Sequence, residues 1–436
     1  MEFLLVLVIL LTCMLQTSWS FSFKYDKTTS DMFSAYLIQD FGVAKGGSLQ
    51  FDYKIQAKNE QLSYKSFILI ITVTEAARVG WYSNLMTVSG ENANYYQAIG
   101  DICHQPSEGR NVLYGVGTYQ YKVKQTDRYS VIIVQCFESY EDNPITVSLN
   151  GFLRNPSTTG EDDGSMLPIQ DIPYINMTLG LTLLYIILIV SLAGQLLLAD
   201  STSRRPIHYL FLLTLALGVA ANASYYGFLM HVDVTGFTHD GYIIAAQIFE
   251  HLFSAAFITS LLLLSLGWTV TRNFLSDKEK QFAAVTVISY IIIGIASATC
   301  LGGTDSTSSC KALGVLMYVL RSIILLGVVV GMNFSITQLR TIIMHLPWVH
   351  GILMQYARVK QYSTFRIAFL LYLLLPTMIL LMQVSLLSWE SYWITDLLIE
   401  LLDVGLILCV GITFAPISEQ FLSRAFDGSI EQMREE

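Results

Sequence analysis

Apolar residues are unevenly distributed along this chain, and the pattern changes near residue 175. Beyond that point, seven apolar stretches follow one another, each long enough to cross a hydrocarbon core of about 30 Å. Their expected spans are 177–199, 207–229, 242–268, 282–301, 312–337, 367–388 and 393–415. The pattern predicts a seven-helix transmembrane domain over residues 175–416, followed by a short cytoplasmic tail at 417–436.

Before the helices, the apolar positions follow the shorter period of β-strands. Two segments alternate between polar and apolar residues, and others are short β-branched runs bounded by Gly, Asn and Pro. The expected strands include 49–55, 66–75, 121–124, 131–137 and 145–152. This part of the chain, residues 21–154, is therefore predicted to be an all-β sandwich ectodomain.

Two further segments flank this predicted ectodomain. The apolar run from Phe3 to Leu15 ends at small residues, so we expect residues 1–20 to be a signal peptide cleaved after Ser20. Because Glu2 stands where a basic residue is usual, an uncleaved anchor remains the alternative. Residues 155–174 are acidic and rich in Pro and Gly, which predicts a linker to the membrane.

Composition agrees with an integral membrane protein. Hydrophobic residues make up 53% of the chain and charged residues only 14%, against about 25% in soluble proteins. The 25 Lys and Arg are outnumbered by 34 Asp and Glu, so nucleic acid is not an expected partner.

The basic residues also predict the orientation of the helices. If the N-terminus is outside, eleven lysines and arginines face the cytoplasm, whereas the outer loops between helices hold only Lys311. The eleven are Arg204, Arg205, Arg272, Lys278, Lys280, Arg340, Arg358, Lys360, Arg366, Arg424 and Arg434. This asymmetry predicts an outer or lumenal N-terminus and an inner C-terminus.

Two pairs of cysteines are candidates for disulfides. Cys103 and Cys136 lie in the exported domain, where the oxidising environment favours a bond between them over two free buried thiols. Cys300 and Cys310 bracket an outer loop, and they either form a second disulfide or leave Cys300 as an ordinary helix residue.

Ionisable residues inside the predicted helices mark the candidate site, because such groups are costly at membrane depth. Glu250, Arg321, Glu400 and Asp403 would share one layer about 10–15 Å below the outer surface. His251 extends a polar stripe beside Glu250. The layer is predicted either to bind a ligand or ion from outside, or to form an internal charge network that fixes helix packing.

Catalysis is not expected from these residues. A zinc hydrolase site needs three ligands, and His251 has no second histidine at its depth. The predicted membrane domain also lacks a Gly-x-Ser-x-Gly elbow and a phosphate-binding Gly-rich loop. We therefore expect no enzyme, no cofactor and no metal.

One segment carries a family resemblance. Residues 245–272 (AAQIFEHLFSAAFITSLLLLSLGWTVTR), above all their LSLGWTVTR ending, resemble the intimal-thickness-related receptor family of GOLD-domain seven-helix proteins. The RRPIH segment at 204–208 is similar as well, whereas Ala415 stands where several relatives carry Arg. The resemblance implies a GOLD-like ectodomain and GPCR-like signalling, sometimes linked to pheromone response. It also implies a rival role in Golgi and endosomal trafficking.

The leading functional hypothesis is thus a receptor for an unknown extracellular or lumenal ligand. It would sit in the plasma membrane or in Golgi or endosomal membranes, with Arg272, Arg340 and Arg358 as candidates for coupling to a G protein. The alternative is a trafficking adaptor or chaperone that binds secretory cargo through the sandwich. A channel or transporter is disfavoured because no inverted repeat is detectable.

Overall fold

The computed structural model describes most of the chain after residue 22. The described residues are 23–29, 34–57, 66–72, 74, 103, 111–136, 145–156, 164–199, 204–235, 240–268, 270–272, 274–301, 308–345 and 351–415. They form two compact units, residues 1–175 with 229–238, and residues 176–228 with 239–436. The predicted signal peptide at 1–20 and the tail at 417–436 lie outside the described residues.

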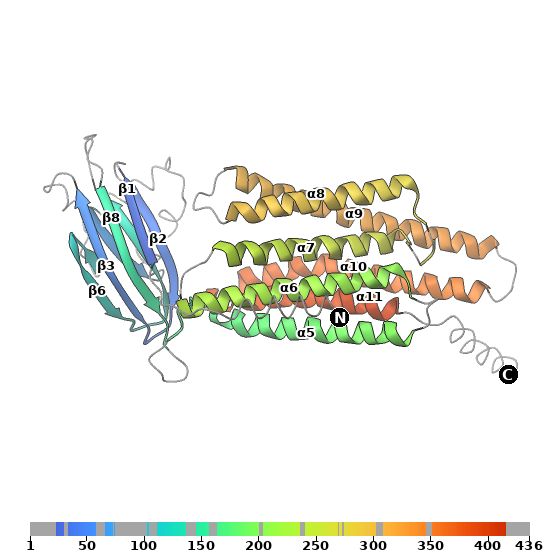
Figure 1. Ribbon diagram of the computed structural model, residues 1–436, viewed down its shortest axis with the longest axis horizontal. Helices are drawn as coiled ribbons and strands as arrows, with labels where there is room; N and C mark the ends of the chain where they lie inside the picture. Colours follow the sequence, from blue (N-terminus) through green and yellow to red (C-terminus); the bar gives the residue numbers. More distant parts are fainter. Residues whose placement is uncertain are drawn as a thin grey trace. The chain divides into compact units, whose positions relative to one another are not determined.

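The first unit is the predicted all-β sandwich (Figure 1). Its described strands form two antiparallel four-stranded sheets, ordered β1-β8-β3-β6 and β2-β7-β4-β5. Their bounds are β1 Phe23–Thr29, β2 Ser34–Val43, β3 Ser48–Ala57, β4 Ser66–Thr72, β5 Asn111–Leu113, β6 Val116–Lys122, β7 Asp127–Gln135 and β8 Ile145–Arg154. One hydrophobic core is shared by both sheets, with Leu49 and Leu149 from the first packed with Ile68 from the second.

Two long strands, β1 and β2, were not predicted, and the structure explains why β2 was missed. In β2 the pairing with β7 shifts between Leu37 and Gln39, so one residue is inserted into the ladder. A bulge of this kind moves the following side chains to the opposite face and breaks the period of two that identifies strands. β1 lies at the edge of its sheet, paired only with β8 among the described strands.

The predicted disulfide between Cys103 and Cys136 is confirmed. It closes a loop with a sequence separation of 33. In the chain-entropy treatment, a loop of this size stabilises the folded unit by about 4 kcal/mol.

The stretch expected to be a linker is anchored to the sandwich where it is described. The Asn155 side chain is buried, accepts a hydrogen bond from the Ala44 N–H at 2.6 Å, and donates to the carbonyls of Gly42 and Leu167. The Ile169 N–H donates to the Gly42 carbonyl at 2.8 Å. Residues 164–169 therefore belong to the folded unit rather than acting as a free spacer.

The second unit contains seven long helices that correspond to the seven predicted spans. They are α5 Ile172–Leu198, α6 Pro206–Thr235, α7 Asp240–Ser265, α8 Asp277–Leu301, α9 Ser308–His345, α10 Gly351–Leu386 and α11 Trp393–Thr413. Both α9 and α10 extend well beyond their apolar spans. Arg340 and Arg358, expected in a loop, therefore lie on these helices.

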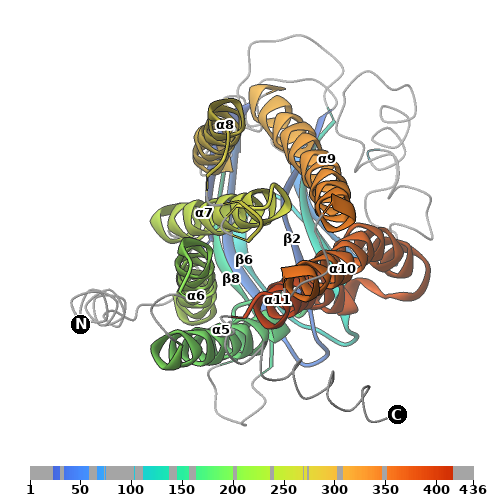
Figure 2. The same cartoon turned by 90° about the vertical axis from the view of Figure 1, so that its right-hand side faces the viewer.

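The helices follow one another around the bundle in sequence order, and α11 lies beside α5 (Figure 2). Six of them, α5 to α10, are long and apolar enough to cross a membrane. α11 carries Asp396, Glu400 and Asp403 within 21 residues, so it is interrupted by more charges than the apolar windows of the other six helices. The apolar core of the bundle draws on all seven helices.

Candidate functional site

The four predicted intramembrane charges come together in one layer of the bundle. Glu250 on α7 lies within electrostatic range of Arg321 on α9 and of Asp403 on α11. Glu400, also on α11, interacts with Asp403 and Glu250. Since Glu250 interacts with groups on two other helices, it faces the bundle interior. We call these four residues, with the tyrosines described next, the polar layer.

Three tyrosines that the sequence did not single out complete this layer. Tyr185 on α5 faces Glu400 and Asp403, and Tyr290 on α8 lies near Arg321 and Glu250. On α10, the Tyr372 hydroxyl accepts a hydrogen bond from Arg321 Nη2 at 3.2 Å. Six helices thus contribute to the polar layer. In the sequence, a tyrosine within an apolar run is typical of an ordinary core residue. The three tyrosines are therefore recognised as part of the polar layer only in the folded structure.

The charges of the polar layer are not closed into ion pairs. Among the described residues, the salt bridges within 4.0 Å are Arg272–Glu279 and Lys280–Asp277, both beyond the end of α7. Glu250 is exposed, and Arg321, Glu400 and Asp403 are only partly buried. The polar layer therefore brings three acidic side chains and one arginine together without a salt bridge among these four described residues.

Some polar atoms of this region lack hydrogen-bond partners. They are the hydroxyl of Tyr185, Oε2 of Glu400 and Oε1 of Gln247, which lies one turn before Glu250. Tyr185 has no exposed surface. Because buried polar groups without partners are rare in folded proteins, these atoms mark a place where a bound group would be stabilised.

His251 does not join the polar layer. It packs against α8, where a Cβ on Gly294 would lie only 3.0 Å from the Cβ of His251. Nor is a metal site indicated, since no cluster of three or more His, Cys, Asp or Glu within the described ranges is arranged to hold an ion.

A continuous series of buried aromatic rings leads from the polar layer to the other end of the bundle. Consecutive ring centroids are 5.5–6.1 Å apart, and every ring is at most 8% exposed. The rings, in spatial order, are Tyr185, Phe253, Phe257, Tyr372, Phe369, Phe365, Phe414 and Tyr362. We call them the aromatic chain; four of its eight members belong to α10.

At its far end, the aromatic chain meets the C-terminus of α7. The Tyr362 hydroxyl donates to the Leu264 carbonyl at 3.0 Å, and Ser335 on α9 donates to the Ser265 carbonyl at 2.8 Å. Arg272 Nη2 donates to the Leu266 carbonyl at 2.8 Å. The last carbonyls of α7, which no longer have partners inside the helix, are thus satisfied by three separate parts of the chain.

The same end of α7 has a glycine cap. Gly267 has a φ of +82°, its N–H donates to the Leu264 carbonyl, and the Trp268 N–H donates to the Leu263 carbonyl. This pair of bonds is the Schellman arrangement, which favours glycine at its left-handed position. The LSLGWTVTR motif is therefore a helix cap followed by an arginine that binds back to the helix.

The end of α11 lies in the same region and is held similarly. His208 Nε2 lies 3.0 Å from the Phe414 carbonyl, and Gln361 Nε2 donates to the Thr413 carbonyl at 2.9 Å. Gln361 and Tyr362 are consecutive on α10. One turn of α10 therefore satisfies the C-termini of both α7 and α11.

The three arginines predicted for coupling differ in their environments. Arg272 is engaged with the Leu266 carbonyl and with Glu279 at 3.1 Å, so it stabilises the α7–α8 connection. Arg340 is exposed on α9, whereas Arg358 is partly buried on α10. The side chains of Cys300 and Cys310 lie outside the described part of the structure, so their predicted pairing stays a prediction.

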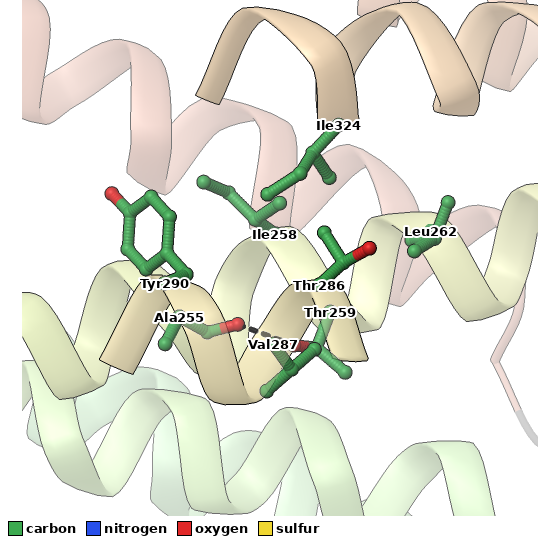
Figure 3. A pocket seen from close by; sticks show the side chains of 8 residues that line it. All are labelled: Ala255, Ile258, Thr259, Leu262, Thr286, Val287, Tyr290 and Ile324. Atoms are coloured by element: carbon green, nitrogen blue, oxygen red, sulfur yellow. Dashed lines mark hydrogen bonds between the residues drawn. The ribbon is translucent and has the colours of Figure 1, made fainter. Parts of the chain in front are cut away.

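A small pocket among α7, α8 and α9 is apolar (Figure 3). Its lining residues are Ala255, Ile258, Thr259, Leu262, Thr286, Val287, Tyr290 and Ile324. The hydroxyls of Thr259 and Thr286 donate to carbonyls of their own helices, so they do not point free donors at a ligand. This pocket is distinct in character from the polar layer, although Tyr290 borders both.

Comparison with known proteins identifies the second unit. The family model for the GOST seven-transmembrane domain matches residues 173–420, which is more than half of the chain. A comparison with curated proteins finds no match. The resemblance of residues 245–272 and the seven helices agree with the family match. This multi-pass membrane protein therefore belongs to the GOST family, the GOLD-domain seven-transmembrane proteins related to the intimal-thickness receptors.

Proposed function

We propose that this chain is a seven-helix receptor whose polar layer senses an outer or lumenal ligand. Binding of a ligand to that layer changes the packing of the aromatic chain. A G protein or another cytoplasmic partner then binds to the altered ends of α7 and α11. The observation that carries this proposal is the unbroken series of rings from Tyr185 to Tyr362. The GOST family match supports a receptor-like role.

The proposed direction of signalling depends on the predicted orientation. The basic residues cluster at the ends of α5, α7, α9 and α11, and this asymmetry favours a cytoplasmic location for the capped end. Packed aromatic side chains interdigitate, so a displaced ring requires its neighbours to move. Spatial continuity alone does not measure coupling, and the coupling itself needs a direct test.

Hydrogen–deuterium exchange on the purified full chain supplies that test. Arg321→Gln removes the one positive charge of the polar layer, and we expect faster amide exchange at residues 264–272. Adding Phe369→Leu interrupts the aromatic chain and reduces this effect. Ser322→Ala, at the neighbouring exposed position on α9, is the matched control. Unchanged exchange at residues 264–272 in Arg321→Gln would contradict the proposal.

The acidic ectodomain favours a second candidate function. Between residues 21 and 172 the chain has 17 Asp and Glu against 12 Lys and Arg, a balance suited to basic cargo. In that case the protein acts as a trafficking adaptor or chaperone. The steady-state location of a C-terminally tagged chain, with and without blocked endocytosis, separates the two: surface signal favours the receptor, and persistent Golgi or endosomal signal favours the adaptor.

A further inference from the structure

The charge of the polar layer is unbalanced. With all four groups ionised, Glu250, Glu400 and Asp403 contribute three carboxylates and Arg321 contributes one guanidinium, a formal excess of two negative charges. His251 packs toward Gly294 and does not offset it. Since uncompensated charge at membrane depth costs several kcal/mol, the layer favours an additional cation.

The unpartnered atoms in the layer and at the adjacent Gln247 are mostly hydrogen-bond acceptors. Glu400 Oε2 and Gln247 Oε1 accept only, and the fully buried Tyr185 hydroxyl can accept as well as donate. A group with several N–H donors complements this arrangement.

Members of the aromatic chain adjoin the same region. Tyr185 packs edge-on against Phe253, and Tyr372 packs edge-on against Phe257, with Phe253 and Phe257 stacked between them. The faces of such rings attract cations, and the attraction strengthens where water is excluded. Carboxylates and aromatic rings together select an organic cation over a fully hydrated inorganic one.

From these three observations we infer that the polar layer binds a primary ammonium group, which lies between Glu400 on α11, Glu250 on α7 and the ring of Tyr185 on α5. The ammonium donates to the two carboxylates and to the unpartnered hydroxyl oxygen of Tyr185. Its source is either a small free amine or a lysine side chain of a peptide. This inference deepens the proposed function by naming the ligand class, and it uses the same site.

Thermal unfolding of the full chain in detergent, followed with defined probes, tests the inference. We expect 2-phenylethylammonium to raise Tm in a saturable way, whereas 2-phenylethanol and sodium chloride at the same concentration do not. Nα-acetyl-lysine amide is the second arm. Stabilisation by this probe alone identifies a lysine side chain as the source, and stabilisation by the free amine alone identifies a small amine.

Two charge-neutral variants locate the binding. Glu400→Gln and, independently, Glu250→Gln are each expected to weaken the apparent affinity for the ammonium about tenfold or more, the cost of losing one charged hydrogen bond. Glu390→Gln makes the same change at an exposed position outside the layer and leaves the affinity unchanged. Tyr185→Phe gives a smaller loss, because the ring remains.

The inference is overturned if neither ammonium stabilises the protein more than the neutral alcohol, or if sodium chloride stabilises it equally. It is also overturned if both layer variants keep full affinity. Failure of this inference and failure of the receptor proposal are distinguishable. If the ammonium does not bind but Arg321→Gln still changes exchange at residues 264–272, only the ligand inference is overturned. If the ammonium binds but exchange is unchanged, only the receptor proposal is overturned.

Discussion

Single polar side chains shape the end of the sandwich unit, and the partly buried Asp171 is one of them. Burial raises the pKa of its carboxyl from 3.8 to about 6, although the nearby Arg128 guanidinium acts in the opposite direction. The residue stands immediately before α5. Its protonation state therefore affects the last part of the chain before the first span.

The raised pKa predicts that this unit is more stable in mild acid. The folded state binds the proton more tightly than the unfolded state, so the contribution of Asp171 is greatest below about pH 4 and is lost as the pH rises through about 6. Asp171→Asn removes this dependence and stabilises the unit at neutral pH. Protease resistance of the sandwich in the full chain, measured across this pH range, checks the prediction.

The control is Asp52→Asn, which makes the same change at an exposed strand position. We expect its pH profile to follow that of the unmodified chain. A profile for Asp171→Asn with the same slope as the unmodified chain between pH 4 and 6 would show that another group is responsible.

The sequence predicts charged residues in the layer better than it predicts their neutral partners. Glu250, Arg321, Glu400 and Asp403 stand out because charge within an apolar run is costly. Tyr185 does not stand out, because its role depends on which way α5 is rotated against α11. Asn155 is missed for a related reason: its surroundings are polar, and its hydrogen bonds to Gly42 and Ala44 join residues that lie 113 and 111 positions apart in sequence.

Among the elements, the end of α7 is the most heavily constrained. Gly267 combines a positive φ with close packing, since a Cβ at this position would lie 2.1 Å from Thr271 Oγ1. Gly331 lets α9 approach, because a Cβ there would lie 2.8 Å from Ser265 Oγ. The boundaries of α7 were predictable from its apolar span, whereas the donors from α9 and α10 that cap it were not, because they lie about 70 and 98 residues away in sequence.

Gly267→Ala is expected to destabilise the bundle by at least about 1 kcal/mol, because alanine is strained in the left-handed region. This corresponds to a Tm lower by about 2–4 °C for a unit of this size. Gly194→Ala on α5 is the matched control, since a Cβ there meets no atom within 4 Å. Equal melting temperatures for the two variants in detergent would refute the strain argument.

At the scale of the whole molecule, one chain contains two units that bury their apolar residues in different ways. The sandwich buries one core between two sheets, whereas the helices place many large apolar residues on their outer surfaces. The strand and helix periods distinguish these units in the sequence, and the seven spans were predictable because each exceeds the length needed to cross a bilayer. The extensions of α9 and α10 were not, since their added turns mix basic and polar residues with apolar ones.

The charge asymmetry predicts the topology of the whole chain. A tag placed after Glu436 is expected to bind antibody only after permeabilisation, whereas a tag placed on the sandwich faces outside or the lumen. Protease protection on sealed vesicles gives an independent reading. Exposure of both tags on the same side would contradict an odd number of membrane crossings.

Pro376 in α10 has a mechanical consequence for the molecule. The helix lacks one backbone hydrogen bond there, so bending is easiest between the polar layer and the outer end. From Pro376 to Gly351 the helix forms a rigid arm of about 38 Å. Gln361 and Tyr362 lie about 21–23 Å from this pivot, so a tilt of about 5° would carry them through roughly 2 Å, enough to lengthen their hydrogen bonds to the carbonyls beyond normal range. Pro376 thus acts as a hinge in α10, so that a small bend near the polar layer produces a larger displacement at the opposite end of the helix.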